Sequence, residues 1–164
     1  MSTYYCAEDE AEVGDLEIDG FPLFCAAWIV ENLYTWWLPA EQRGVTKIRP
    51  GVDGARVYRR RRAATRRPLN MLISGEVDRL GNEYDNWMEG MQANIDDLTE
   101  NLVDPVDSDD GVRSAILTMP SGELRVGPVQ VLGPMEVEGM KANARYCYAV
   151  IDVLLPAGRL IAAP

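Results

Sequence analysis

Histidine is absent from this chain of 164 residues, and cysteine occurs only three times. Without histidine, the Ser-His, Cys-His and His-metal arrangements of common catalytic sites are excluded. Cys6, Cys25 and Cys147 lack the CxxC spacing of metal knuckles, and we interpret Cys25 and Cys147 as small buried hydrophobic residues. Carboxylates could still support a hydrolase, but no carboxylate pair at a defined spacing stands out. We therefore expect no enzymatic activity, no metal and no cofactor.

Long apolar runs are also absent, and none approaches the ~20 residues that span a bilayer. The segment Met1–Asp19 has seven acids and no base, the opposite of a secretory signal. We expect a soluble chain that stays where it is made and does not contact a membrane. We predict that residues 1–13 form a flexible acidic arm and that residues 14–164 form a single β-rich domain.

Charge is strongly segregated along the chain, although the net charge is −10. Residues 43–67 have ten bases and one acid, a balance of +9, which leaves −19 for the rest. Residues 76–110 have twelve acids and one base. We interpret the centre of the basic segment as a patch for an inter-subunit or channel-facing role, made of Arg59, Arg60, Arg61, Arg62, Arg66 and Arg67. Its candidate acidic counterpart consists of Glu83, Asp85, Glu89, Asp96, Asp97 and Glu100.

Two interpretations of the basic patch remain open. Arginine makes bidentate contacts to carboxylates and phosphates alike, so the patch suits an acidic protein surface or a nucleic acid. Because the rest of the chain would repel phosphate, we favour an acidic protein surface, within the subunit or on a neighbour. A nucleic-acid-binding module that uses residues 59–67 is the alternative of another class.

Hydrophobic periodicity predicts one long helix, from about Glu83 to Leu102. Trp87, Met91, Ile95, Leu98 and Leu102 recur at spacings of three and four residues, which places them on one apolar stripe. Such a stripe is typical of core packing.

Most of the remaining chain predicts β-strands. The candidate strands are Leu16–Asp19, Phe21–Val30, Tyr34–Leu38, Ala55–Tyr58, Leu69–Val77, Val112–Met119, Glu123–Leu132 and Ala144–Leu155. We expect a hairpin turn at residues 120–122 and a further turn at Gly133-Pro134. Because both faces of Ala144–Leu155 are largely apolar, this strand should lie centrally in a sheet or at a subunit contact. The pattern predicts an α+β fold that is mainly β: an antiparallel sandwich or partly closed barrel with one long helix packed on it.

Several short motifs can be read together with this pattern. They are Arg43-Gly44, Pro50-Gly51, Asp53-Gly54, the strand Leu69–Gly75 (LNMLISG) and the helical segment Asn94–Leu102. In this order the chain resembles, over roughly residues 15–158, the N-terminal domain of distal tail proteins and related minor tail proteins of long-tailed, siphovirus-type phages. Many such proteins have a second domain that resembles a carbohydrate-binding module, and we expect no such domain within these 164 residues. The acidic segment 1–13 also lies outside the family pattern.

The resemblance implies a structural subunit of the virion that is made in the host cytoplasm. It would form a ring, often a hexamer, at the distal end of the tail tube and connect the tube to the host-recognition apparatus. Its partners would be further copies of itself, the tail tube protein, the tape-measure protein and downstream tail-tip or hub proteins. DNA would pass through the ring's channel without specific binding. A tail tube or tail-completion subunit shares a related fold and remains an alternative.

Overall fold

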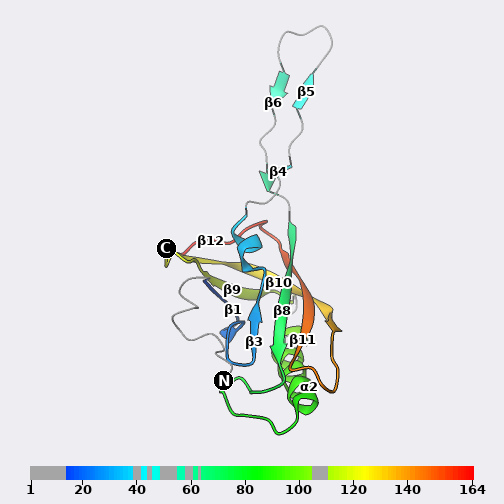
Figure 1. Cartoon of the computed structure of the whole chain (residues 1–164). Coiled ribbons are helices and arrows are strands. Elements are labelled where there is room, and N and C mark those ends of the chain that lie inside the picture. The colour runs from blue at the N-terminus through cyan, green and yellow to red at the C-terminus, as the bar shows by residue number, and fades with distance from the viewer. Residues whose placement is uncertain are drawn as a thin grey trace.

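In the computed structural model, one long strand, β10 (Leu124–Glu138), connects two halves of an antiparallel sheet (Figure 1). The structure describes residues 14–38, 42–43, 46–48, 55–57, 61–62, 64–104 and 111–164, without the side chains between residues 39 and 63. The predicted arm 1–13 lies outside the described residues. In the described part, the sheet order is β2-β1-β9-β10-β11-β8-β3, and β12 also pairs with β10.

The first half of the sheet contains the N-terminal part of β10. Its residues 124–129 pair with β9, and β9 pairs with β1. The bounds in this half are β1 Asp15–Ile18, β2 Phe21–Pro22, β9 Arg113–Thr118 and β12 Ile161–Ala162.

The second half contains the C-terminal part of β10. Its residues 130–138 pair with β11, β11 pairs along its whole length with β8, and β8 pairs with β3. The bounds here are β3 Trp28–Val30, β8 Thr65–Ser74 and β11 Tyr146–Leu155. As predicted, β11 is central, with partners on both sides.

The hydrophobic core lies between the two halves. Leu16 and Leu117 from the first half are fully buried, as are Met71 and Ile151 from the second. Alternate residues of each strand point into this core, because successive side chains of a strand face opposite sides. The prediction of an α+β, mainly β fold is confirmed, and the sheet is not closed into a barrel.

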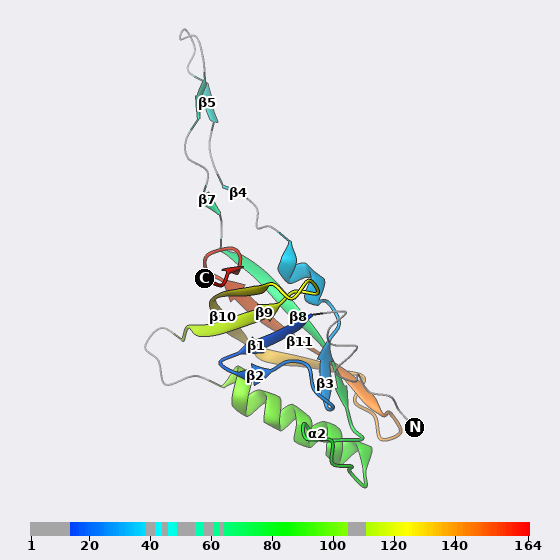
Figure 2. The ribbon, with the colours of Figure 1, turned by 90° about the vertical axis from the view of Figure 1, so that its left-hand side faces the viewer.

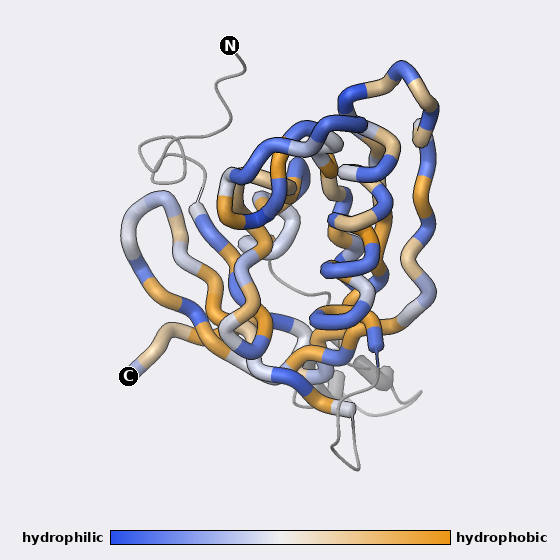
Figure 3. Tube along the Cα trace, turned by 90° about the horizontal axis from the view of Figure 1, so that it is seen from below, coloured by the Kyte–Doolittle hydropathy of each residue, from blue (hydrophilic) through white to orange (hydrophobic). Residues whose placement is uncertain are grey.

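The helix α2 (Trp87–Leu98) continues as a π-helical turn, η2 (Thr99–Val103), and lies along one end of the two layers (Figure 2). It begins where the Asn86 side chain accepts a hydrogen bond from the Met88 N–H at 2.9 Å. Met91, Leu98 and Leu102 are fully buried, which confirms the predicted stripe. Seen from this end, hydrophilic and hydrophobic residues are interspersed along the helix (Figure 3).

The helix begins four residues later than predicted because a tight loop occupies residues 77–83. The Asp78 carboxylate accepts hydrogen bonds from the N–H groups of Leu80 and Asn82, both at 2.8 Å. Val77 forms an isolated antiparallel bridge with Glu83. These hydrogen bonds hold the backbone of Glu83 in an extended bridge, so it cannot enter the helix.

Two of the strand predictions were wrong. Tyr34–Leu38 is not a strand, since residues 33–37 form a 3-10 helix, η1 (Leu33–Trp37). The Asn32 side chain bonds the Pro68 C=O at 2.8 Å and the Asn70 N–H at 2.9 Å, so it replaces the next step of the β3–β8 ladder and the chain turns away. The segment predicted as one strand, 21–30, is two short strands joined by a bend.

The predicted turn at Gly133-Pro134 is also wrong, because β10 continues through it. The register with β11 shifts between Leu132 and Glu136, which is a β-bulge. Proline has no N–H for the ladder, and the bulge takes up this interruption without reversing the chain. The hairpin turn at residues 120–122 is confirmed by the antiparallel pairing of β9 with β10.

Candidate interaction surfaces

Four short strands between η1 and β8 form a projecting hairpin, called the arm below. Its strands pair two by two, β4 with β7 and β5 with β6, both antiparallel. Their bounds are β4 Gln42–Arg43, β5 Thr46–Ile48, β6 Ala55–Val57 and β7 Arg61–Arg62. The arm extends beyond the end of β8, away from both halves of the sheet (Figures 1 and 2). The predicted strand at 55–58 is therefore part of the arm.

The predicted basic patch divides between the arm and β8. Arg61 and Arg62 form β7, with side chains outside the described part of the structure, and Arg59 and Arg60 lie outside the described residues. The other two arginines of the patch, Arg66 and Arg67, lie at the start of β8. Arg66 is exposed, while Arg67 is half-buried and its Nη2 donates to the Leu38 carbonyl oxygen at 3.1 Å.

The predicted acidic counterpart lies at the opposite end of β8, on and before α2. Asp97 is half-buried and lies 3.6 Å from Arg79, and Asp96 accepts a hydrogen bond from Gln92 at 2.8 Å. The other four acids are exposed: Glu83, Asp85, Glu89 and Glu100.

Arg66 and Arg67 of the basic patch and its predicted acidic counterpart lie near opposite ends of β8. Helix α2 contacts the chain directly after β8, where Gly90 packs against the carbonyl of Gly75. Arg67 lies eight residues before Gly75, which is roughly 26 Å along a strand. The described arginines, Arg66 and Arg67, therefore do not pair with the helix acids of their own subunit. Pairing across a subunit boundary remains a prediction.

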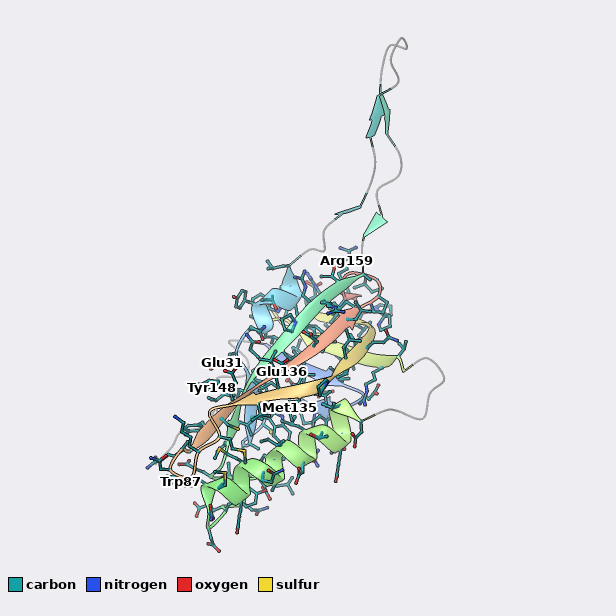
Figure 4. The ribbon with its side chains drawn as sticks, turned by 90° about the vertical axis from the view of Figure 1, so that its right-hand side faces the viewer. Glu31, Trp87, Met135, Glu136, Tyr148 and Arg159 are labelled. Carbon is teal, nitrogen blue, oxygen red and sulfur yellow. The ribbon has the colours of Figure 1, made fainter. Side chains whose placement is uncertain are left out.

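A second acidic surface, which the sequence interpretation missed, covers the outward side of β10, β11, β8 and β3. We call it the sheet face. Tyr148 and Val150 of β11 lie at its centre and are 52% and 37% exposed. Exposed Glu136 and Glu138 flank them on β10, and exposed Glu31 follows β3 on the other side. Figure 4 shows Glu31, Tyr148 and Glu136 together on this side.

The sequence did contain a signal for the sheet face. The two-sided apolar pattern of residues 144–155 predicted a central strand or a subunit contact, and Tyr148 and Val150 are on its outward side. The acids could not be assigned to the face, because Glu31 and Glu136 are about a hundred residues apart in the chain. Only the pairing of β3, β8, β11 and β10 brings them to one surface.

The described residues include no group of three or more His, Cys, Asp or Glu side chains that could hold a metal ion. Burial raises the pKa of the Cys147 thiol to about 11 and also raises the pKa of Cys25, so both thiols are held in the neutral form. No helix of the described part is both long and apolar enough to cross a membrane.

No family model matches the sequence, and no curated protein matches it either. The fold is similar to the crystal structure of the SPP1 Dit protein (gp 19.1), described as a paradigm of the hub adsorption apparatus in phages that infect Gram-positive bacteria. The TM-score is 0.54 at 12% sequence identity, and the match covers 89% of this chain and 51% of the Dit chain. This chain thus spans about half the length of that protein. The resemblance to a phage distal tail protein is confirmed at the level of the fold.

Proposed function

We propose that this protein is a structural subunit of a phage tail tip. The observation that supports this most strongly is the fold similarity to SPP1 Dit, which extends over 89% of the chain. The finer proposal is a ring, with a hexamer as the expected stoichiometry, at the distal end of the tail tube. The ring would connect the tube to the host-recognition apparatus and would be carried in the virion.

The shape of the subunit supports a role in assembly. The strands of the arm project away from the two halves of the sheet (Figure 1). Opposite charges at separate places on one subunit favour a heterologous contact, in which one surface meets a different surface of the next copy. We propose that further partners are the tail tube protein, the tape-measure protein and downstream hub proteins, and that DNA passes through the channel without specific binding. We propose no catalytic role and no cofactor.

Two alternatives remain as proposals. A tail tube or tail-completion subunit would have a related fold and the same need for self-association. A nucleic-acid-binding module is favoured by one specific feature, because the projecting arm has eight bases and one acid between residues 42 and 62. Phosphate-driven binding by such an arm should weaken steeply with salt.

Mass photometry and negative-stain microscopy of the purified chain, alone and mixed with the products of neighbouring tail genes, test the proposed function. We expect closed rings or ring-sized oligomers at micromolar concentration. A strict monomer that forms no ring with any of these proteins would argue against a ring subunit. A shift of labelled DNA at low salt by a chain that remains monomeric would favour the nucleic-acid alternative.

A further inference from the structure

The outward side of the first half of the sheet has an exposed apolar centre, which we call the outer patch. Ile161 of β12 pairs with Val126 of β10, and Val126 pairs with Ile116 of β9, so three apolar residues form one row. Leu124 lies two residues before Val126 and therefore on the same side of the sheet. Ile161, Leu124 and Ile116 are 56%, 46% and 38% exposed, so no other described element covers them.

Burial of the neighbouring residues shows that the outer patch faces away from the core. Ala115 and Leu117, on either side of Ile116, are fully buried. Because side chains alternate along a strand, Ile116 must point to the opposite side. Figure 2 looks onto this side of the first half of the sheet. Exposed apolar side chains that lie next to one another, unlike scattered ones, are typical of a surface that another molecule covers.

Two carboxylates of β1 border the outer patch. Glu17 is the β1 partner of Ile116, and Asp15 is the β1 partner of Thr118, two residues further along β9. Both acids are half-buried. Neither pairs with a cation of the described part, where the ion-paired acids are Asp19, Glu76, Asp97 and Glu123. Burial raises the pKa of the Asp15 carboxyl, so its negative charge has a cost that a nearby cation would offset.

A molecule that covers the outer patch needs apolar side chains with a base beside them, opposite β1. Nucleic acid or an anionic lipid surface would be repelled by the two carboxylates. We propose that the outer patch binds a different protein, whose contacting surface has apolar side chains next to Lys or Arg. This inference rests on the proposed function, because it assigns a surface of the subunit to a partner in the assembly.

A second copy of this chain meets these requirements less well. Outside residues 43–67 the chain has only six bases. Four of them already pair with acids of their own subunit: Arg79, Arg113, Arg125 and Arg145. Apart from residues 43–67, a second copy therefore offers little basic surface to Asp15 and Glu17.

Two full-length variants with matched substitutions test the apolar part of the contact. The patch variant has the substitutions Ile116→Thr, Leu124→Thr and Ile161→Thr. The control variant changes three exposed residues of the second half: Val137→Thr, Tyr148→Thr and Val150→Thr. All six positions are exposed and threonine is a good strand former, so both variants should fold, which circular dichroism checks.

Biolayer interferometry measures binding, with the purified products of the neighbouring tail genes as probes. For one of these proteins, we expect the patch variant to dissociate about tenfold faster than wild type, or more. The control variant should dissociate within about twofold of the wild-type rate.

A second pair of variants tests the role of the carboxylates. Asp15→Asn with Glu17→Gln keeps the shape of both side chains and removes their charge. Glu136→Gln with Glu138→Gln gives the same change in net charge on the other half of the sheet. The first pair of substitutions should slow association with the same protein about threefold or more and reduce its dependence on salt, whereas the second should leave both unchanged.

The outcomes separate this inference from the proposed function. A patch variant that binds as tightly as the control variant would overturn the inference, as would a wild-type chain that forms rings but binds none of these proteins. A patch variant that loses self-association while its binding to the other proteins is unchanged would also overturn it, and would identify a second copy as the occupant. In these cases ring formation by wild type leaves the proposed function standing. A wild-type chain that neither forms a ring nor binds any of these proteins would contradict both.

Discussion

At the scale of single residues, the contact between α2 and β8 depends on two glycines. A Cβ added to Gly90 would overlap the Gly75 carbonyl oxygen and lie 2.7 Å from Cδ2 of Tyr84. Beside this contact, the buried Asn94 side chain donates to the carbonyl oxygens of Ser74 and Val77 at 2.7 and 2.9 Å. Close backbone approach and these hydrogen bonds therefore fix the helix on the strand together.

The substitution Gly90→Ala should destabilise the protein, although alanine is the better helix former. Helix propensity alone would stabilise it by about 1 kcal/mol. Overpacking against a backbone carbonyl should outweigh that gain and give a net loss of about 2 kcal/mol in the free energy of unfolding. Urea denaturation measures the difference, with exposed Glu89→Ala in the same turn as a near-neutral control. Unchanged or increased stability of Gly90→Ala would show that the helix can shift without cost.

The thiol of Cys147 should be inert until the protein unfolds. It is fully buried, and burial raises its pKa from 9.0 to about 11. At pH 8 this difference alone lowers the thiolate fraction on the order of 100-fold, and lack of access slows the reaction further. Pulsed alkylation with mass spectrometry should label half-buried Cys25 before Cys147. Fast labelling of Cys147 at pH 8 in the native state would contradict its burial.

The same shift has a defined sign for stability. Below pH 9 the thiol is protonated in both states, so the free energy of unfolding is unaffected. Between pH 9 and 11 the unfolded chain ionises first, and stability falls as pH rises.

At the scale of elements, hydrophobic periodicity predicted the helices and strands that bury an apolar face. It failed where the hydrogen bonds of a side chain change the direction of the backbone. The stripe from Trp87 to Leu102 and the alternation of β11 depend on burial of one or both faces, and both predictions are confirmed. The 3-10 helix at 33–37 depends on Asn32, whose side chain bonds residues 36 and 38 positions later in the chain. A local sequence pattern cannot predict hydrogen bonds between residues that are so far apart in the chain.

The candidate surfaces were predictable to a similar extent. The sequence shows where charge is concentrated, but which charges share a surface follows from strand order. The sequence predicted only turns and a short strand at 55–58 in the arm. The strands β4 and β5 have two and three residues, which is too short for an alternating pattern to be recognised. The sheet face needed the full set of pairings from β3 to β10.

Replacing residues 42–62 by a short Gly-Ser linker should remove self-association and leave the domain folded. The β8 residues from Thr65 onward pair with β11, and β8 residues 71–73 also pair with β3, so these pairings do not depend on the arm. The free energy of unfolding should change by about 1 kcal/mol or less, as for surface changes in general. Thermal unfolding and mass photometry of the same sample measure both properties. A chain that unfolds on loss of the arm would show that the arm supports its own domain.

At the scale of the whole molecule, charge segregation should make the proposed self-association depend on salt. Residues 43–67 contribute +9 against −19 elsewhere, so subunits joined through opposite charges lose attraction as ions screen them. The Debye length, over which charges are screened, shortens from about 10 Å at 0.1 M salt to about 3 Å at 1 M salt. We expect the dissociation constant for self-association of wild type to rise about tenfold or more over this range. Sedimentation velocity at several salt concentrations measures it.

The choice of salt distinguishes the electrostatic from the apolar contribution to the proposed self-association. Sodium chloride should weaken it by screening, whereas sulfate at equal ionic strength should weaken it less, because sulfate strengthens apolar burial around Tyr148. A variant with Glu31→Lys, Glu136→Lys and Glu138→Lys provides the control, since a contact without these exposed carboxylates should respond little to sodium chloride. Association that is insensitive to both salts would show that the segregated charges lie outside the interface, and the arm's bases would then be free for another acidic partner.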